Sequence, residues 1–466
     1  MAGAAGVATG VWSPGRRVLT AGLVATITLV AVESLSVATV LPLVGRDLGD
    51  LRLYGWVFSA FFLASLVGIA TAGRLADRVA LVGPFLSGLA CFAVGLVVGG
   101  AAPSMAVLVA GRALQGLGAG AVPAAAYVAI GRAYPAASRP RMFAVLSTAW
   151  VVPGIVGPSL AAVVAAAAGW RWVFLGLVPL VALAALVSGP ALRAVPSPPP
   201  GSDAPTSATT TPALATALGA AVVLAGLSTD RLVVAVPLAV AGAAVGGRAL
   251  RRLVPPGTFR AARGLPAAVA TRGLLTFGYF GVDAYVPLTL TTDRHAPTAV
   301  GGAALTAATM TWTAGAWGQA RLLGRFGARR LVAVGVATVV AGIGLFSLML
   351  VGGAPVWLGV VAWAVAGLGI GTAYAPLSVT TLEQAPPGEQ GRASAALQLT
   401  DTLGTALGAG AGGAAVAVAH RQGWPLGDGL GLGFAVAAAV ALLGVAAAGG
   451  LPGAADRGDD SGPACG

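Results

Sequence analysis

The sequence predicts an all-α polytopic membrane protein: two six-helix bundles related by pseudo-two-fold symmetry, plus two inserted central helices. Three observations support this class. Hydrophobic residues make up 57% of the 466-residue chain and charged residues only 9%, against about 25% charged in soluble proteins. Apolar runs of roughly 20 residues recur along the chain, the length of a helix that crosses about 30 Å of hydrocarbon. The two halves of the chain also repeat one another. Because lipid offers no partners to backbone amides, such runs must be helical.

About fourteen spans are expected, in four regions. The N-terminal six-helix bundle covers 1–193, and a flexible linker with two extra spans covers 194–263. The C-terminal six-helix bundle covers 264–450, and a disordered tail covers 451–466. The expected spans are 18–43, 54–72, 81–101, 105–131, 143–168, 172–192, 213–229, 232–249, 265–290, 298–319, 331–352, 356–378, 393–418 and 429–450.

The arginines predict the orientation. All 27 basic residues are arginine. With the N-terminus inside, 19 of them fall in cytoplasmic segments and 6 in external ones, as the positive-inside rule requires. The first apolar stretch, Val18–Leu43, is interpreted as a retained span, because it is long for a signal peptide and contains Glu33. Both termini are therefore expected in the cytoplasm. The high Ala, Gly and Arg content without Lys is typical of a GC-rich bacterial genome, so a bacterial cytoplasmic membrane is expected.

A sequence repeat relates the two bundles. Gly116–Gly120 (GLGAG) matches Gly367–Gly371 (GLGIG) at an offset of 367 − 116 = 251. The same offset aligns Gly73-Arg74 with Gly324-Arg325. Parallel repeats of this kind are typical of transporters, in which the substrate site lies at the repeat interface near the midplane.

Three motifs resemble those of the major facilitator superfamily. Gly73–Arg78 (GRLADR) is similar to its loop signature between spans two and three, although Ala80 stands where a glycine is usual. Arg112–Gly118 (RALQGLG) is similar to the span-four signature R-x-x-Q-G-x-G. Pro153–Pro158 (PGIVGP) resembles part of the span-five antiporter signature, without its final glycine pair. The arrangement of six, two and six spans is similar to the 14-span drug:proton antiporter branch.

This resemblance implies roles for two sets of motif residues. A conformational latch between the bundles would contain Gly73, Asp77 and Arg78, and the alternative is a solvated loop that carries only a topology signal. The antiporter motif would contain Gly154, Gly157 and Pro158, which could bend span five or only pack there.

Ionisable groups inside the membrane are costly and usually face a cavity. The predicted spans contain the acids Glu33, Asp283 and Asp401. An apolar cavity favours the uncharged form of a carboxyl group, which suits a proton carrier. By resemblance Arg112 faces span one, so the proton-coupling candidates are Glu33, Arg112 and Asp283, with Glu33 first. A structural ion pair between Glu33 and Arg112 is the alternative.

Other polar and aromatic side chains are candidates for a substrate cavity. Aromatic rings that face a cavity bind flat or cationic molecules, whereas aromatic residues at the lipid interface are common. Gln115 could also orient the Glu33 carboxylate from one helical turn beyond Arg112. The expected cavity residues are Gln115, Trp150, Tyr279, Tyr285 and Asp401.

The sequence therefore favours proton-coupled efflux of drug-like, lipophilic or cationic small molecules by alternating access. The alternative is a lipid or lipid-linked metabolite translocase of the same fold, and a non-transporting sensor is a third possibility. An enzyme is not expected, because the sequence offers no Ser-His-Asp set, metal cluster or phosphate loop. No cofactor or metal is expected. The expected partners are a small-molecule substrate, protons and the lipid bilayer, with a monomeric protein and no nucleic acid.

Overall fold

The computed structural model describes residues 11–76, 78–135, 138–196, 207–229, 231–351, 353–386 and 389–453, and every regular element in them is helical. The first nine helices are α2 (Arg17–Leu48), α3 (Tyr54–Ala76), α4 (Val82–Gly100), α5 (Met105–Ala133), α6 (Arg139–Ala168), α7 (Arg171–Leu175), α8 (Val178–Arg193), α9 (Ser207–Leu227) and α10 (Leu232–Leu250). The remaining helices are α11 (Leu265–Asp283), α12 (Val286–Leu288), α13 (Thr298–Ser347), α14 (Val356–Glu383), α15 (Gln390–Gln422) and α16 (Leu426–Ala448).

The helix lengths confirm the predicted fold class. Within the described residues, 11 helices are long and apolar enough to cross a membrane. One of them, α13, bends at Gly327, which has a φ of 75°, so it supplies two of the expected spans. Two expected spans are not among the 11: α6, of 30 residues, and α11, of 19 residues. Together these helices account for the fourteen spans.

The chain forms two compact units. The first contains Met1–Leu53 and Ala60–Leu218, and the second contains Tyr54–Ser59 and Gly219–Gly466. The finer boundaries expected from the sequence at 193, 263 and 450 stay predictions. Most of the proline-rich linker and of the C-terminal tail lies outside the described residues.

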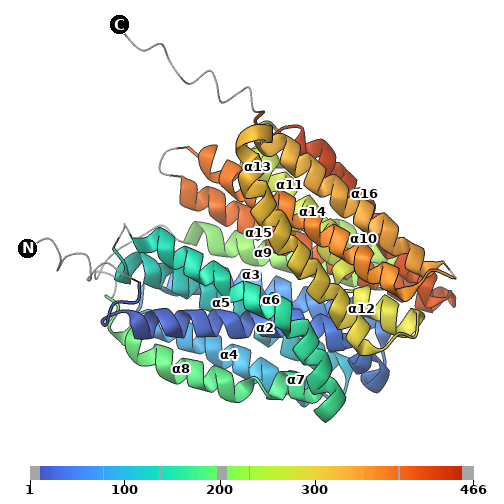
Figure 1. Cartoon of the computed structure of the whole chain (residues 1–466), viewed down its shortest axis with the longest axis horizontal. Helices are drawn as coiled ribbons and strands as arrows, with labels where there is room; N and C mark the ends of the chain where they lie inside the picture. Colours follow the sequence, from blue (N-terminus) through green and yellow to red (C-terminus); the bar gives the residue numbers. More distant parts are fainter. Residues whose placement is uncertain are drawn as a thin grey trace, which may run out of the picture. The chain divides into compact units, whose positions relative to one another are not determined.

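In the first unit, α2 packs against α5, α6 and α8, as Figure 1 shows. The glycines of α5 let two backbones touch. A Cβ atom placed on Gly116 would lie 2.1 Å from the carbonyl oxygen of Phe61 on α3, and one on Gly120 would lie 2.1 Å from that of Ser65. The glycine stretch is therefore a close helix contact, as its small residues predict.

The same contacts in the second unit correct the repeat offset. Gly367 approaches the carbonyl oxygen of Ala308, and Gly371 approaches that of Trp312. The α3 partners Phe61 and Ser65 therefore correspond to Ala308 and Trp312 at an offset of 308 − 61 = 247, not 251. The offset of 251 relates α5 to α14, but it does not relate α3 to the first part of α13.

A longer connection explains the difference of four residues. In the first unit α4 ends at Gly100 and α5 begins at Met105. In the second unit α13 ends at Ser347, and a 3₁₀ turn over Leu348–Leu350 delays the start of α14 to Val356. The second-unit counterpart of Arg78 is thus Arg325 (78 + 247) rather than the residue at an offset of 251.

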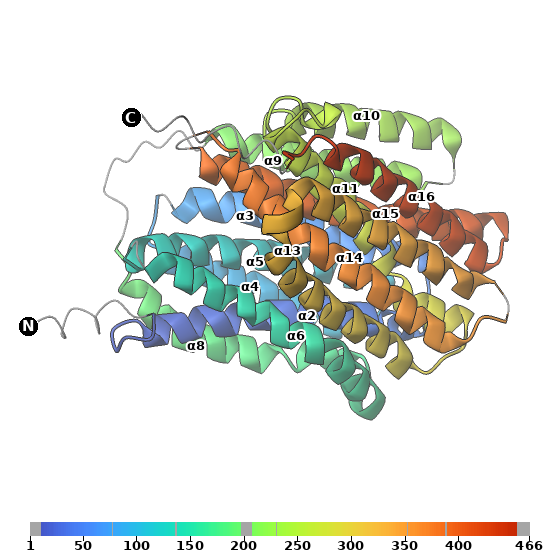
Figure 2. The ribbon, with the colours of Figure 1, turned by 45° about the horizontal axis from the view of Figure 1, so that its top comes forward.

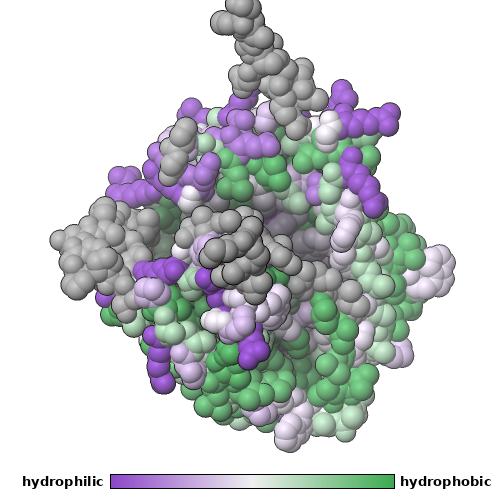
Figure 3. Space-filling view, turned by 60° about the vertical axis from the view of Figure 1, so that its left-hand side comes forward, coloured by the Kyte–Doolittle hydropathy of each residue, from purple (hydrophilic) through white to green (hydrophobic). Residues whose placement is uncertain are grey.

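The two extra helices, α9 and α10, form a close hairpin, and Figure 2 shows them side by side. A Cβ atom on Gly219 of α9 would lie 2.5 Å from Gly246 Cα of α10. In the space-filling view of Figure 3, hydrophilic residues gather around the helix ends that face the viewer, whereas hydrophobic residues cover the flanks. This distribution suits helices whose sides meet lipid.

Candidate functional site

The first polar cluster lies inside the first unit, between α2 and α5. Arg112 Nη1 donates hydrogen bonds to Glu33 Oε1 and to Gln115 Oε1. Gln115 Nε2 donates in turn to the carbonyl oxygen of Gly95 on α4, at 3.0 Å. The sequence-predicted Glu33, Arg112 and Gln115 are thus brought together, and the ion pair links the first helix of the unit to its fourth.

This ion pair is excluded from solvent. The side chains of Glu33 and Arg112 are each only 1% exposed. The Arg112 guanidinium carbon lies 4.2 Å from the centroid of the Phe61 ring, in a cation–π contact. The second carboxylate oxygen, Glu33 Oε2, is buried without a hydrogen-bond partner among the described residues. A buried pair of this kind is sensitive to any change in the charge of either partner.

The second cluster lies in the second unit, where α11 meets α14. Trp363 Nε1 donates a hydrogen bond of 2.8 Å to Asp283 Oδ1. The Tyr279 ring stacks on the Trp363 indole, with centroids 5.0 Å apart and an interplanar angle of 26°. Trp312 meets the edge of the Tyr279 ring at 5.6 Å and contacts Tyr374 at 5.4 Å. These rings form a continuous aromatic series that begins beside the Asp283 carboxylate.

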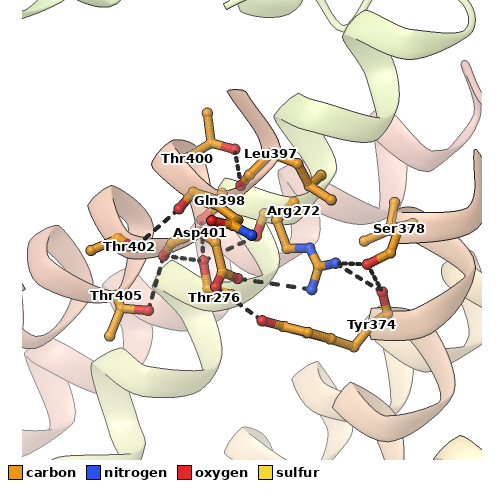
Figure 4. Close-up of polar contacts among 12 residues, drawn as sticks. Arg272, Thr276, Tyr374, Ser378, Leu397, Gln398, Thr400, Asp401, Thr402 and Thr405 are labelled. Carbon is orange, nitrogen blue, oxygen red and sulfur yellow. Dashed lines mark hydrogen bonds and ion pairs between the residues drawn. The ribbon is translucent and has the colours of Figure 1, made fainter. Parts of the chain in front are cut away.

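The third cluster, at the other end of that series, contains Arg272, an arginine inside the expected span 265–290. Arg272 of α11 reaches α14, where its Nη2 donates to Ser378 Oγ at 2.5 Å and to the Tyr374 carbonyl oxygen at 3.0 Å (Figure 4). Its Nη1 lies 3.8 Å from Asp401 Oδ1 on α15, within ion-pair range. The Tyr374 hydroxyl donates to Asp401 Oδ2 at 2.9 Å.

Arg272 is the most deeply buried charge of this third cluster, and it stacks on an aromatic ring. The Arg272 side chain is 2% exposed, against 25% for Asp401. The Arg272 guanidinium carbon lies 3.4 Å from the centroid of the Tyr374 ring. Its distance from Asp283, eleven residues along α11, is about 16 Å at 1.5 Å per residue, so the two do not pair. The only sequence signal for the Arg272–Asp401 pair was the presence of both charges in predicted spans.

Comparison with known proteins decides the family. A family model described as the Major Facilitator Superfamily matches residues 21–409 and again 268–457. The chain belongs to the Major Facilitator Superfamily. The second match falls on the second half of the chain, as expected for a duplicated bundle. This superfamily and its fold are those of membrane transporters.

Curated relatives within the Major Facilitator Superfamily narrow the comparison. A "Probable multidrug-efflux transporter" of Mycobacterium tuberculosis is 32% identical over 416 residues, which cover 85% of this chain and 86% of the relative. Multidrug resistance protein 3 of Bacillus subtilis is 32% identical over 162 residues, or 35% of this chain and 32% of the relative. The chain is therefore similar to multidrug-type members of the superfamily.

Solved structures of Major Facilitator Superfamily type support the fold alone. A bacterial homolog of the human lysosomal transporter Spinster gives a TM-score of 0.66 at 16% identity, covering 93% of this chain and 96% of that chain. A D-xylose-proton symporter gives a TM-score of 0.67 at 14% identity, covering 94% of this chain and 98% of that chain.

The superfamily's loop motif lies at the end of α3. Gly73 lies in the last turns of that helix, and Arg78 is exposed just beyond it. Asp77 lies outside the described residues, so its predicted latch contact stays a prediction. Arg132, at the end of α5, donates a hydrogen bond of 2.8 Å to the carbonyl oxygen of Ala76. This bond ties the end of α3 to α5 next to the motif.

The antiporter-type motif lies within α6 and faces α2. Pro158 is inside the helix, and Gly154 and Gly157 are buried. The Gly157 carbonyl oxygen accepts a hydrogen bond of 3.3 Å from Ser36 Oγ, three residues beyond Glu33. The motif is therefore close to the helix turn that carries the coupling candidate.

One predicted cavity residue, Tyr285, lies outside the three clusters. The Tyr285 hydroxyl is buried and donates to the carbonyl oxygen of Ala409 on α15, at 2.6 Å. The centroid of the Tyr285 ring lies 5.5 Å from that of the Tyr54 ring. Tyr285 therefore joins helices within the second unit. Trp150 belongs to α6, but its side chain lies outside the described residues. Their roles in a cavity stay predictions.

The third cluster yields a stability prediction. Tyr374→Phe removes one hydrogen bond to Asp401 but keeps the ring on Arg272, so we expect the free energy of unfolding to fall by about 1 kcal/mol. Arg272→Met leaves Asp401 without its cation, and we expect a larger loss. Because Asp401 is partly exposed, that loss should fall short of the roughly 3–5 kcal/mol typical of a broken buried pair. Thermal unfolding in detergent micelles gives the ranking, and equal losses would contradict it.

Proposed function

We propose that this chain exports drug-like, lipophilic or cationic small molecules across a bacterial cytoplasmic membrane, driven by inward proton flow. The observation that carries the proposal is the buried Glu33–Arg112–Gln115 cluster, in a chain 32% identical over most of its length to a probable multidrug-efflux transporter. A carboxylate that must gain and lose a proton needs a partner whose contact can change, and Arg112 is such a partner.

The proposed cycle couples this contact to alternating access. While Arg112 contacts Glu33, the cation stabilises the ionised carboxylate. If α2 and α5 move apart during the cycle, Glu33 loses that cation in an apolar environment and takes up a proton. When the contact re-forms, the proton is released on the other side. Gln115 keeps Arg112 oriented through the Gly95 carbonyl oxygen.

The remaining predicted residues have supporting roles in this proposal. Tyr279, Asp283 and Asp401, with Trp150 and Tyr285, would line the substrate path in the membrane. Gly73, Asp77 and Arg78 would latch one conformation, and Gly154, Gly157 and Pro158 would seal the path on one side. The arginine distribution supports cytoplasmic termini, and the protein is proposed to act as a monomer.

Transport by the purified full-length protein in proteoliposomes tests the proposal. In an antiporter, protons that leave an acidic lumen drive substrate inward, so a lumen two pH units below the bath should concentrate a lipophilic fluorescent dye. A protonophore should abolish this accumulation. Accumulation that is independent of the pH gradient would refute proton coupling. Movement of labelled phospholipid, with no movement of dye, would favour a lipid translocase instead.

A further inference from the structure

The three acids of the predicted spans, Glu33, Asp283 and Asp401, differ in their counter-ions. Glu33 pairs with Arg112, and Asp401 lies 3.8 Å from Arg272. Asp283 has no ion pair among the described residues, and its hydrogen-bond partner is a neutral indole. A carboxylate without a cation in an apolar interior is expensive unless another positive group approaches it.

The repeat shows how this difference arises. Arg112 stands four residues before Gly116, and Trp363 stands four residues before Gly367, the matching glycine of the second unit. Each contacts the acid of the first helix in its own unit: Arg112 binds Glu33, and Trp363 binds Asp283. The two units therefore make the same contact from equivalent positions, once with a cationic donor and once with a neutral one.

The surroundings of Asp283 suit a cation. Asp283 is the last residue of α11, so it lies at the negative end of the helix dipole, where an anion is disfavoured and a cation is favoured. The Trp363 side chain is fully buried and Tyr279 is 3% exposed, so aromatic rings flank the carboxylate of Asp283, which is itself only partly buried. Aromatic rings beside a carboxylate attract organic cations through their π faces.

We infer that Trp363 determines substrate charge. By placing a neutral donor where the first unit has an arginine, it orients Asp283 without neutralising it, so that Asp283 binds the positive centre of a lipophilic monovalent organic cation. This inference rests on the proposed function, because it assigns a substrate class to the same transporter. Glu33 and Asp401 are less suited to this role, because each already faces an arginine.

Equilibrium binding to the purified full-length protein tests the inference without a proton gradient. The probe is radiolabelled tetraphenylphosphonium, and uncharged triphenylphosphine oxide is the matched neutral ligand. Trp363→Arg and Trp363→Gln both replace the ring with a flexible donor, but only arginine adds a charge. Asp283→Asn removes the carboxylate and keeps the tryptophan. Thermal unfolding of each variant reports whether it is folded.

We expect Trp363→Arg and Asp283→Asn to weaken tetraphenylphosphonium binding by about tenfold or more, which corresponds to roughly 1.4 kcal/mol. Trp363→Gln removes the ring without adding a charge, so it should weaken tetraphenylphosphonium binding by a factor at least about three times smaller than Trp363→Arg does, and Asp283→Asn should change the binding of the neutral ligand by less than about threefold. Equal affinities of the arginine and glutamine variants would overturn the inference. So would wild-type affinity in Asp283→Asn, which keeps the test decisive if the Trp363 variants do not fold. Absence of binding to the wild type would also overturn it, whereas gradient-driven dye uptake judges the proposed function separately.

Discussion

Glu33→Gln is expected to reduce dye accumulation driven by a pH gradient to the level seen without a gradient. Glutamine has nearly the same size as glutamate and offers an oxygen to Arg112, but it cannot carry a proton. Exchange of labelled for unlabelled substrate needs no net proton movement, so it should persist. Proteoliposome uptake with and without an acidic lumen measures both quantities. The contrast between lost accumulation and retained exchange separates coupling from binding.

Asp47→Asn provides the matched control for Glu33→Gln. Asp47 is on the same helix, but its side chain is 48% exposed and bonds Arg171 and Trp170 near the helix end. Its loss of charge should leave gradient-driven accumulation unchanged. If Glu33→Gln instead kept wild-type accumulation, Glu33 would be only half of a structural ion pair, and another acid would have to carry the proton.

The sequence was sufficient for the fold and for the first cluster, for a physical reason. Span length and apolar composition determine which segments become helices in lipid. The resemblance of Arg112–Gly118 to a known motif implied that Arg112 faces the first span, and the structure has that contact with Glu33. Local sequence pattern and family motif both point to one helix pair here.

Contacts between distant helices were not predictable in the same way. Arg272 and Asp401 are 129 residues apart (401 − 272), and helix periodicity does not specify which faces of α11 and α15 meet. The partner of Asp283 was missed because Trp363 is one of ten tryptophans, and its local sequence does not indicate that its indole N–H reaches an acid on another helix. It becomes informative only when α14 is aligned with α5 and the hydrogen bond to Asp283 is known.

The repeat offset failed in the second and third helices because composition hid an insertion. The chain has 70 glycines, so short matches such as Gly73-Arg74 with Gly324-Arg325 arise easily. Phe61 and Ala308 are equivalent, because each presents its carbonyl oxygen to the matching glycine of its own unit. These helices are therefore related by an offset of 247 residues (308 − 61). In a sequence rich in glycine and alanine, backbone contacts are a stricter criterion for aligning the two halves than matches of residue type.

Gly120→Ala is expected to destabilise the first unit by about 1–3 kcal/mol or more. The added Cβ atom would lie 2.1 Å from the carbonyl oxygen and 2.8 Å from the carbonyl carbon of Ser65 on α3. These are backbone atoms, so no side chain can rotate away, and α3 and α5 must separate. Overpacking of this kind costs about 1–3 kcal/mol even when neighbours can adjust. Thermal unfolding in detergent micelles should show a lower midpoint, with reduced transport.

Gly131→Ala on the same helix is the matched control, and it should have the opposite effect. A Cβ atom at Gly131 would meet nothing within 4 Å, and alanine favours a helix over glycine by about 1 kcal/mol. Gly131→Ala should therefore raise the midpoint temperature of unfolding, whereas Gly120→Ala should lower it. Gly371→Ala should behave like Gly120→Ala, because its Cβ atom would lie 2.1 Å from the Trp312 carbonyl oxygen. If all three variants unfolded alike, helix propensity rather than backbone contact would explain the glycines, and the close α3–α5 packing would be wrong.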